Sequence, residues 1–155
     1  MLTADAGTFA ACFAALYAAH EVGDHWFQTH RQACGKGAAG WAGRVLCARH
    51  VATLTMTKAA ALGLVTVVLG LGVHPVWVLV GLGVDAVSHY WADRRWTLTA
   101  LADWLGRWLL PGKGDFVRLG DGVAAPTGTG AYALDQSWHI GWLFIAALIV
   151  SLGVG

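Results

Sequence analysis

Residues 41–72 read WAGRVLCARHVATLTMTKAAALGLVTVVLGLG, and most of this stretch is apolar. A helix of roughly 20 such residues crosses the hydrocarbon layer of a bilayer, which is about 30 Å thick. Residues 8–28, 75–91 and 132–153 have the same character. The pattern therefore predicts an all-α fold, in which four transmembrane helices run up and down as a bundle. We expect residues 1–155 to form a single integral membrane domain.

The composition favours a membrane protein over other classes. Of the 155 residues, 57% are hydrophobic and only 12% are charged, whereas charged residues make up roughly a quarter of an ordinary soluble domain. A disordered chain would be poor in apolar residues. The net charge of +1 offers no basic surface for nucleic acid. The expected partner is the lipid bilayer, and a homo-oligomer stays open.

The basic residues predict how the helices are oriented. They cluster in or beside the first and third connections between the apolar stretches, apart from Lys58, which lies inside the second stretch. Positively charged connections remain on the cytoplasmic side of a membrane. We therefore expect a multi-pass protein of the cell inner (plasma) membrane with both termini outside.

The third connection has a helical pattern of its own. Between residues 94 and 110, Trp and Leu recur at helical spacing with Asp103 and Arg107 between them. Such a segment is typical of an amphipathic helix that lies in the membrane interface. Alternatively, the third span continues as one long exposed helix. Residues 111–130 are rich in Gly and are expected to form a loop.

Ionisable residues inside membrane helices are costly and mark functional sites. Here they occur as pairs four residues apart, so the members of each pair share a helix face. The pairs lie at the end of the first span, the end of the third and the start of the fourth, and His50 lies near the start of the second. In an up-and-down bundle all these positions fall at one level near the cytoplasmic face. The seven candidate metal ligands are His20, Asp24, His50, Asp85, His89, Asp135 and His139.

Three buried carboxylates need counter-charges, since unpaired buried charges are costly. Two divalent ions, of zinc, iron or manganese, would balance them and suit imidazole and carboxylate ligands. Asp24, Asp85 or Glu21 is then the candidate catalytic base. Two structural readings stay open: the pairs knit helices together as ion pairs, or Asp135 caps the fourth helix.

The same motifs resemble a family of small four-helix bacterial membrane proteins of unknown function. That family is similar in layout to membrane-bound metal-dependent hydrolases, and the resemblance covers nearly the whole chain. It implies a metal-dependent activity and supplies no substrate. The residues that carry it are His20-x3-Asp24-x3-Gln28, Lys36, His50, Asp85-x3-His89 and Asp135-Gln136-x2-His139.

The sequence thus predicts a membrane metalloenzyme with a dinuclear His/Asp site, acting as a hydrolase of a lipid-like or small amphiphilic substrate. A metal-dependent redox or group-transfer enzyme of secondary metabolism is the first alternative. A metal-ion transporter is disfavoured because the outer halves of the spans offer almost no polar groups. A haem electron carrier is disfavoured because an Asp lies one turn from three of the histidines.

Overall fold

The protein is helical in a computed structural model that describes residues 3–122 and 128–152. This confirms the predicted all-α class. In chain order the elements are α1 (Ala6–Val22), the π-helix η1 (Gly23–Phe27), α2 (His30–Gly35), α3 (Gly40–Leu69), α4 (Pro75–Asp93), α5 (Trp96–Trp108), α6 (Lys113–Val117) and α7 (Gly130–Val150).

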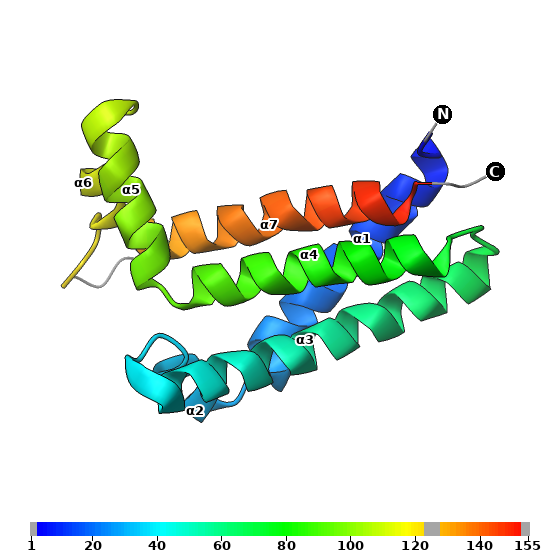
Figure 1. Cartoon of the computed structure of the whole chain (residues 1–155), viewed down its shortest axis with the longest axis horizontal. Coiled ribbons are helices and arrows are strands. Elements are labelled where there is room, and N and C mark those ends of the chain that lie inside the picture. Colours follow the sequence, from blue (N-terminus) through cyan, green and yellow to red (C-terminus); the bar gives the residue numbers. More distant parts are fainter. Residues whose placement is uncertain (1–2, 123–127, 153–155) are drawn as a thin grey trace.

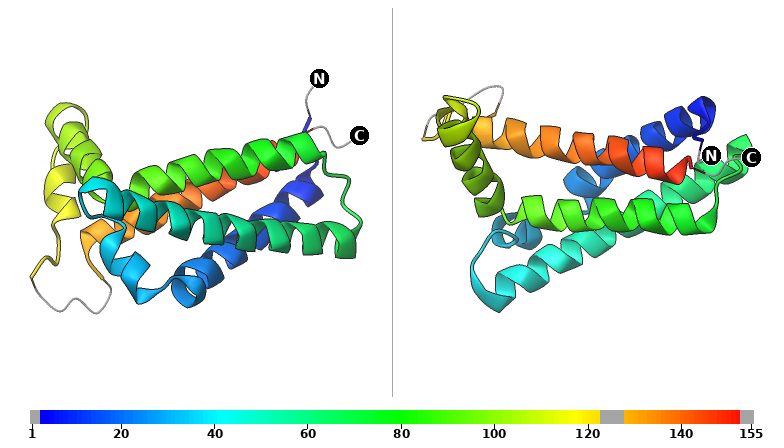
Figure 2. Two further views of the ribbon diagram at one scale, coloured as in Figure 1. Left: turned by 60° about the horizontal axis from the view of Figure 1, so that its bottom comes forward. Right: turned by 45° about the horizontal axis from the view of Figure 1, so that its top comes forward.

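The four long helices α1, α3, α4 and α7 form the body of the molecule (Figure 1). Helix α4 packs against α7 and α3, and α1 packs against α3 and α7 from the other side. The start of α1, the end of α7 and the turn between α3 and α4 lie at one end, whereas α2, α5 and α6 lie at the other (Figures 1 and 2). We call these the core end and the connection end.

The core end is held together by apolar packing. Its cluster of buried side chains comes from α1, α3, α4 and α7, and partly buried aromatic residues of α1 cover it. The buried members are Cys12, Leu16, Leu62, Leu82, Leu143, Ala146, Ala147 and Val150.

Local signals in the sequence explain where the long helices begin and end. The Asp5 carboxylate accepts a hydrogen bond from the Thr8 amide and so caps α1. Gly70 adopts a left-handed conformation with φ 62° and ends α3. Pro75 occupies the first turn of α4, where a missing amide hydrogen carries no penalty. The predicted stretches 41–72 and 75–91 therefore match α3 and α4 closely.

A sharp corner separates α4 from α5, so the third apolar helix does not continue as one long exposed helix. Arg95 sits at this corner with φ 61°, a conformation that side chains other than Gly adopt only rarely. The buried Arg94 guanidinium donates to the carbonyl oxygens of Lys36 at 2.7 Å and Ala38 at 2.6 Å. These bonds tie the corner to the connection between α2 and α3. Helix α5 lies within the predicted interfacial segment 94–110, and turns steeply away from α4 (Figure 2).

Two short helices were not predicted. Helix α2 follows Thr29, whose side chain and that of Gln32 form a reciprocal capping box. Helix α6 lies within the Gly-rich segment 111–130, which we expected to be loop. Arg118 joins α6 to α5 through hydrogen bonds of 2.7 and 2.9 Å to the Asp103 carboxylate. These bonds hold the pKa of that carboxyl below its usual range.

Within residues 3–122 and 128–152, two helices, α3 and α7, are long and apolar enough to cross a membrane. The other two long helices do not meet the same requirement of length and composition together. Helix α1 comprises 17 residues before the chain enters the π-helix. Helix α4 carries Asp85, His89 and Asp93 in its second half, which lowers its mean hydropathy.

Candidate metal centre

A cluster of His and Asp side chains lies inside the connection half of the molecule. It draws on η1, α3, α4 and α7. Because the long helices run alternately up and down, α1 and α4 finish at the same end of the molecule at which α3 and α7 begin (Figure 1). Acids and imidazoles that are remote in sequence are brought together in this way.

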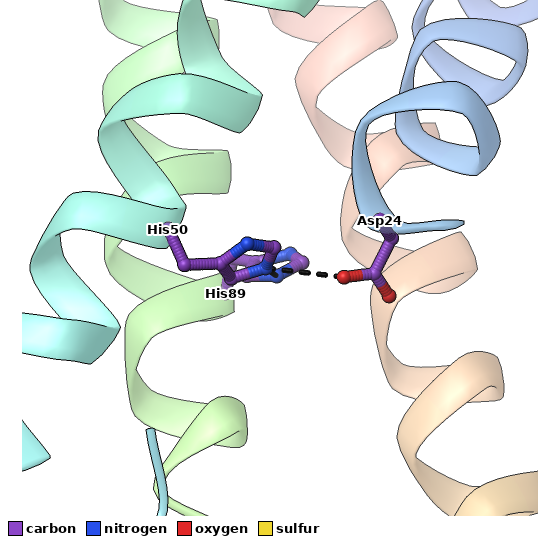
Figure 3. A group of neighbouring side chains, drawn as sticks. All are labelled: Asp24, His50 and His89. Atoms are coloured by element: carbon purple, nitrogen blue, oxygen red, sulfur yellow. Dashed lines mark hydrogen bonds and ion pairs between the residues drawn. The ribbon is translucent and has the colours of Figure 1, made fainter. Parts of the chain in front are cut away.

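The π-helix η1 positions the acid from the first segment. Its wider turn is closed by the backbone amide of Gln28, which donates to the Gly23 carbonyl at 3.1 Å. A Cβ at Gly23 would lie 2.3 Å from Leu54 Cδ1 of α3, so a larger residue here would force the Leu54 side chain to shift. As a result Asp24 points towards His50 and His89 (Figure 3).

Asp24, His50 and His89 place their ligand atoms within 4.8 Å of one another at the centre of the cluster. His50 Nε2 lies 3.1 Å from Asp24 Oδ1, 3.2 Å from His89 Nε2 and 3.3 Å from Asp93 Oδ2. His89 Nε2 lies 3.2 Å from Asp93 Oδ2. Ligands held at 2.0–2.1 Å by a tetrahedral zinc ion are about 3.3 Å apart. The distances from His50 Nε2 to Asp24 and His89 are therefore those expected between ligands of one such ion.

A second group of donors shares residues with the first. His89, Asp93 and His139 each place a ligand atom within 4.8 Å of the others. The other oxygen of Asp93, Oδ1, lies 3.8 Å from His139 Nε2, and Asp135 Oδ1 lies 3.4 Å from the same nitrogen. Asp93 thus faces both groups, as a bridging carboxylate would. These buried groups could hold a metal ion.

Several polar atoms of the cluster are buried without a hydrogen-bond partner in the described part of the chain. They are both ring nitrogens of His20, Nδ1 of His89, Nε2 of His139 and both oxygens of Asp93. Buried polar groups are nearly always hydrogen-bonded, and an unsatisfied group costs about 1–3 kcal/mol. A cation between the rings and the carboxylates would satisfy His139 and Asp93 in particular.

Two polar side chains orient the ligands from the connections. The side-chain amide of Gln28 donates to Asp24 Oδ1 at 3.2 Å, and its nitrogen Nε2 lies 3.0 Å from each ring nitrogen of His50. The buried Lys36 ammonium lies 2.8 Å from Asp93 Oδ1 and 3.7 Å from Asp24 Oδ1. Such neighbours fix the orientation of metal-ligating groups.

The cluster is reached from a cavity of about 390 Å³ at the connection end. Asp24 and Asp93 form part of its wall, together with Lys36 and Arg95. Asp135 and Gln136 line it from the start of α7, and Leu98 lines it from α5. We call this cavity the polar pocket.

The structure places the predicted site residues in three ways. Asp24, His50, His89 and His139 belong to the two donor groups. His20 adjoins them, with its ring centre 5.2 Å from that of His139 and 5.5 Å from that of His89. Asp135 adjoins them through His139.

Two predicted catalytic acids lie elsewhere. Asp85 is buried, and its carboxylate forms an ion pair of 2.6 Å with Lys58, which is fully buried. Glu21 is 3.7 Å from His25 on an exposed face of the molecule. The structure therefore brings neither acid to the donor groups.

Asp93 was not among the predicted site residues, although it lies within 4 Å of Lys36, His50, His89 and His139. It lies four residues after His89 on α4, so the spacing Asp85-x3-His89 continues as His89-x3-Asp93. Extending the same spacing by one turn would have found it. Lys36 was noted as part of a basic connection and among the residues that carry the family resemblance, but nothing in its neighbours in sequence indicates that it is buried.

The comparisons with known proteins provide no family for this arrangement. No family model matches the chain, and neither a curated protein nor a solved structure has significant similarity to it. The function must therefore be argued from the cluster itself.

Proposed function

We propose that this protein is an integral membrane metalloenzyme with four membrane-spanning helices, which hydrolyses a lipid-like or small amphiphilic substrate at the cytoplasmic face. The observation that carries the proposal is the two overlapping donor groups, Asp24 with His50 and His89 and His89 with Asp93 and His139, of which Asp24 and Asp93 line the polar pocket. The resemblance to small bacterial membrane proteins points the same way.

The distribution of polar and apolar side chains supports the membrane location. Lys58 and the cluster histidines are among the most buried side chains, whereas large apolar side chains of α3 and α4 face outwards. Val67 on α3 is 81% exposed and Val87 on α4 is 73% exposed. Apolar side chains outside and ionisable side chains inside are what a bilayer requires. The basic connections then place the polar pocket on the cytoplasmic side.

The pocket favours catalysis over a purely structural metal site. Structural zinc sites are closed by four protein ligands, whereas catalytic sites stay open to substrate. Each donor group here supplies three protein ligands, and Asp24 and Asp93 line a cavity large enough for a small ligand. A divalent ion at this place would polarise a carbonyl or phosphoryl oxygen and lower the pKa of water. The second donor group, with His139, would hold a second ion and share Asp93.

Asp135 is the best-placed general base. Its carboxylate lines the polar pocket and lies 3.4 Å from His139, outside the two donor groups. In hydrolysis it would take a proton from the attacking water as the new bond to the carbonyl or phosphoryl atom forms. It would return that proton to the departing alcohol oxygen as the ester bond breaks. The side-chain amide of Gln136, which donates to Asp135 Oδ2 at 3.4 Å, would keep the carboxylate oriented.

Metal analysis of the purified protein tests the proposal. The detergent-purified protein should contain one or two zinc, iron or manganese ions per chain by elemental analysis. His50→Ala and Asp93→Ala should each lower zinc affinity by at least a hundredfold in titration calorimetry, with helicity unchanged by circular dichroism. His30→Ala is the matched control, since this exposed histidine of α2 lies outside the cluster. Unchanged zinc affinity in both cluster variants would refute the metal centre.

Hydrolysis is tested separately with 4-nitrophenyl esters and phosphodiesters. We expect turnover that chelators abolish and zinc or manganese restores. Asp135→Asn should reduce the rate by at least a hundredfold while leaving metal content unchanged, because a positioned base contributes about 10²–10⁴-fold. Metal-loaded protein that hydrolyses none of these compounds would refute the assignment as a hydrolase.

A further inference from the structure

We infer that the substrate is a single-chain amphiphile with an anionic head group, whose head enters the polar pocket and whose chain lies in an apolar groove between α5 and α7. The inference rests on the proposed function and names the substrate class of the same site. It is carried by two cavities that share one lining residue, Leu98, of which one contains the charged groups of the cluster and the other is almost wholly apolar.

The groove has a volume of about 350 Å³ and an almost wholly apolar wall. Leu101 and Leu105 line it from α5, and Trp138 and Trp142 line it from α7. The side chain of Leu98 lines both this groove and the polar pocket. A molecule that occupied both would therefore need an apolar chain and a polar head at opposite ends.

The charges of the polar pocket favour an anionic head. Lys36 and Arg95 line it on one side, and Asp24, Asp93 and Asp135 are its acids. A divalent ion at the donor groups would offset the charges of Asp24 and Asp93. The two cations then exceed the remaining carboxylate of Asp135, so a phosphate or carboxylate head is attracted electrostatically.

The aromatic residues of α5 place the groove at a suitable depth. Trp96, Trp104 and Trp108 are 62%, 49% and 73% exposed. Tryptophan side chains on the surface of membrane proteins concentrate at the level of the lipid head groups. A single-chain amphiphile has its junction of head and chain at this same level. It could therefore slide from the bilayer into the groove without leaving the interface.

Gly141 offers a direct way to block the groove. This residue of α7 lines it, and a Cβ built there meets no atom within 4 Å. Gly141→Leu should therefore fill the groove without disturbing the fold. Gly83→Leu is the matched control, because Gly83 is an exposed helical glycine of α4 with equally open space, outside the groove. Trp142→Ala is a second groove variant, which removes part of the wall instead.

The experiment measures binding of inorganic phosphate, butyl phosphate and hexyl phosphate. The full chain is loaded with cobalt in phosphatidylcholine nanodiscs, and the cobalt absorption spectrum reports each titration. Hexyl phosphate should bind about fifteenfold more tightly than butyl phosphate, because each of the two additional buried methylenes contributes about fourfold. Hexylammonium should not compete with either.

The variants separate the groove from simple partition into the bilayer. Gly141→Leu and Trp142→Ala should lose most of the dependence on chain length and keep their affinity for inorganic phosphate. Gly83→Leu should behave as the unchanged protein. Equal affinity for all three phosphates, competition by hexylammonium, or a dependence on chain length that survives in both groove variants would overturn the inference. Failure to load cobalt would instead refute the proposed metal centre.

Discussion

The buried ion pair between Lys58 and Asp85 leads to a quantitative prediction. The Lys58 side chain is 0% exposed and the Asp85 side chain 3%, and their 2.6 Å contact links α3 to α4. Removing one partner leaves an uncompensated buried charge, which costs about 3–5 kcal/mol. Lys58→Met and Asp85→Leu should therefore each lower the free energy of unfolding by this amount. The corresponding decrease in the folding equilibrium constant is at least a hundredfold.

The double variant should be far more stable than either single variant. Replacing both charges with apolar side chains of similar size is often neutral or stabilising. Unfolding in mixed micelles with dodecyl sulfate, followed by circular dichroism, measures all four proteins of the cycle. We expect a coupling energy of about 3 kcal/mol or more. A coupling below about 1 kcal/mol would refute the reasoning, because the two charges would then not depend on each other.

The same double variant distinguishes a structural role for Asp85 from a role as metal ligand. The structure pairs Asp85 with Lys58 and leaves the donor groups to other residues. Lys58→Met combined with Asp85→Leu should therefore keep the metal content of the unchanged protein. Loss of metal in this double variant, with the helices intact, would return Asp85 to the ligand set.

Three further predictions concern packing and charge. Gly81→Ala should lower the free energy of unfolding by about 1–3 kcal/mol, because its Cβ would lie 2.9 Å from a backbone oxygen of α7. Gly83→Ala should be neutral or stabilising in the same unfolding assay, because a Cβ there meets no atom within 4 Å. Arg94→Met should destabilise by about 2 kcal/mol or more, since two carbonyl groups lose their donor; faster amide exchange at residues 36–38 is the measurement. The pKa of Asp103 is lowered, so its carboxylate is ionised and paired with Arg118 at neutral pH. The stability that this pair contributes should be lost only below about pH 4, as the carboxylate becomes protonated. Amide protection of α6 should fall there in the unchanged protein and be low at every pH in Arg118→Met.

Much of the fold could be predicted because its signals are local. Apolar length, Pro75 and the glycines after α3 mark the long helices directly. The corner at Arg95 could not be predicted, since a positive φ at Arg is imposed by tertiary contacts. The π-helix was equally hidden, because α1 is apolar on all sides and offers no stripe whose displacement would reveal the extra residue per turn.

The part of the candidate site that could be predicted is the part that depends on residue spacing within a single helix. Residues four apart share a helix face, and this placed Asp24 and the cluster histidines at a common level. The pairing of Asp85 with Lys58 depends on the register of α4 against α3, which no local pattern encodes. Asp93 was missed because we ended the third span at residue 91, two residues before Asp93, which completes the stripe.

The connection between α2 and α3 is attached to the cluster at two points. Lys36 is ion-paired with Asp93, and Arg94 holds the neighbouring carbonyl groups. Thermodynamic linkage makes any such attachment reciprocal. A cation bound to Asp93 would weaken the ion pair between Asp93 and Lys36. The order of the segment between α2 and α3 would therefore depend on whether the cation is bound. Conversely, a protein that bound this segment would change how tightly the cation is retained, without contacting the cation itself.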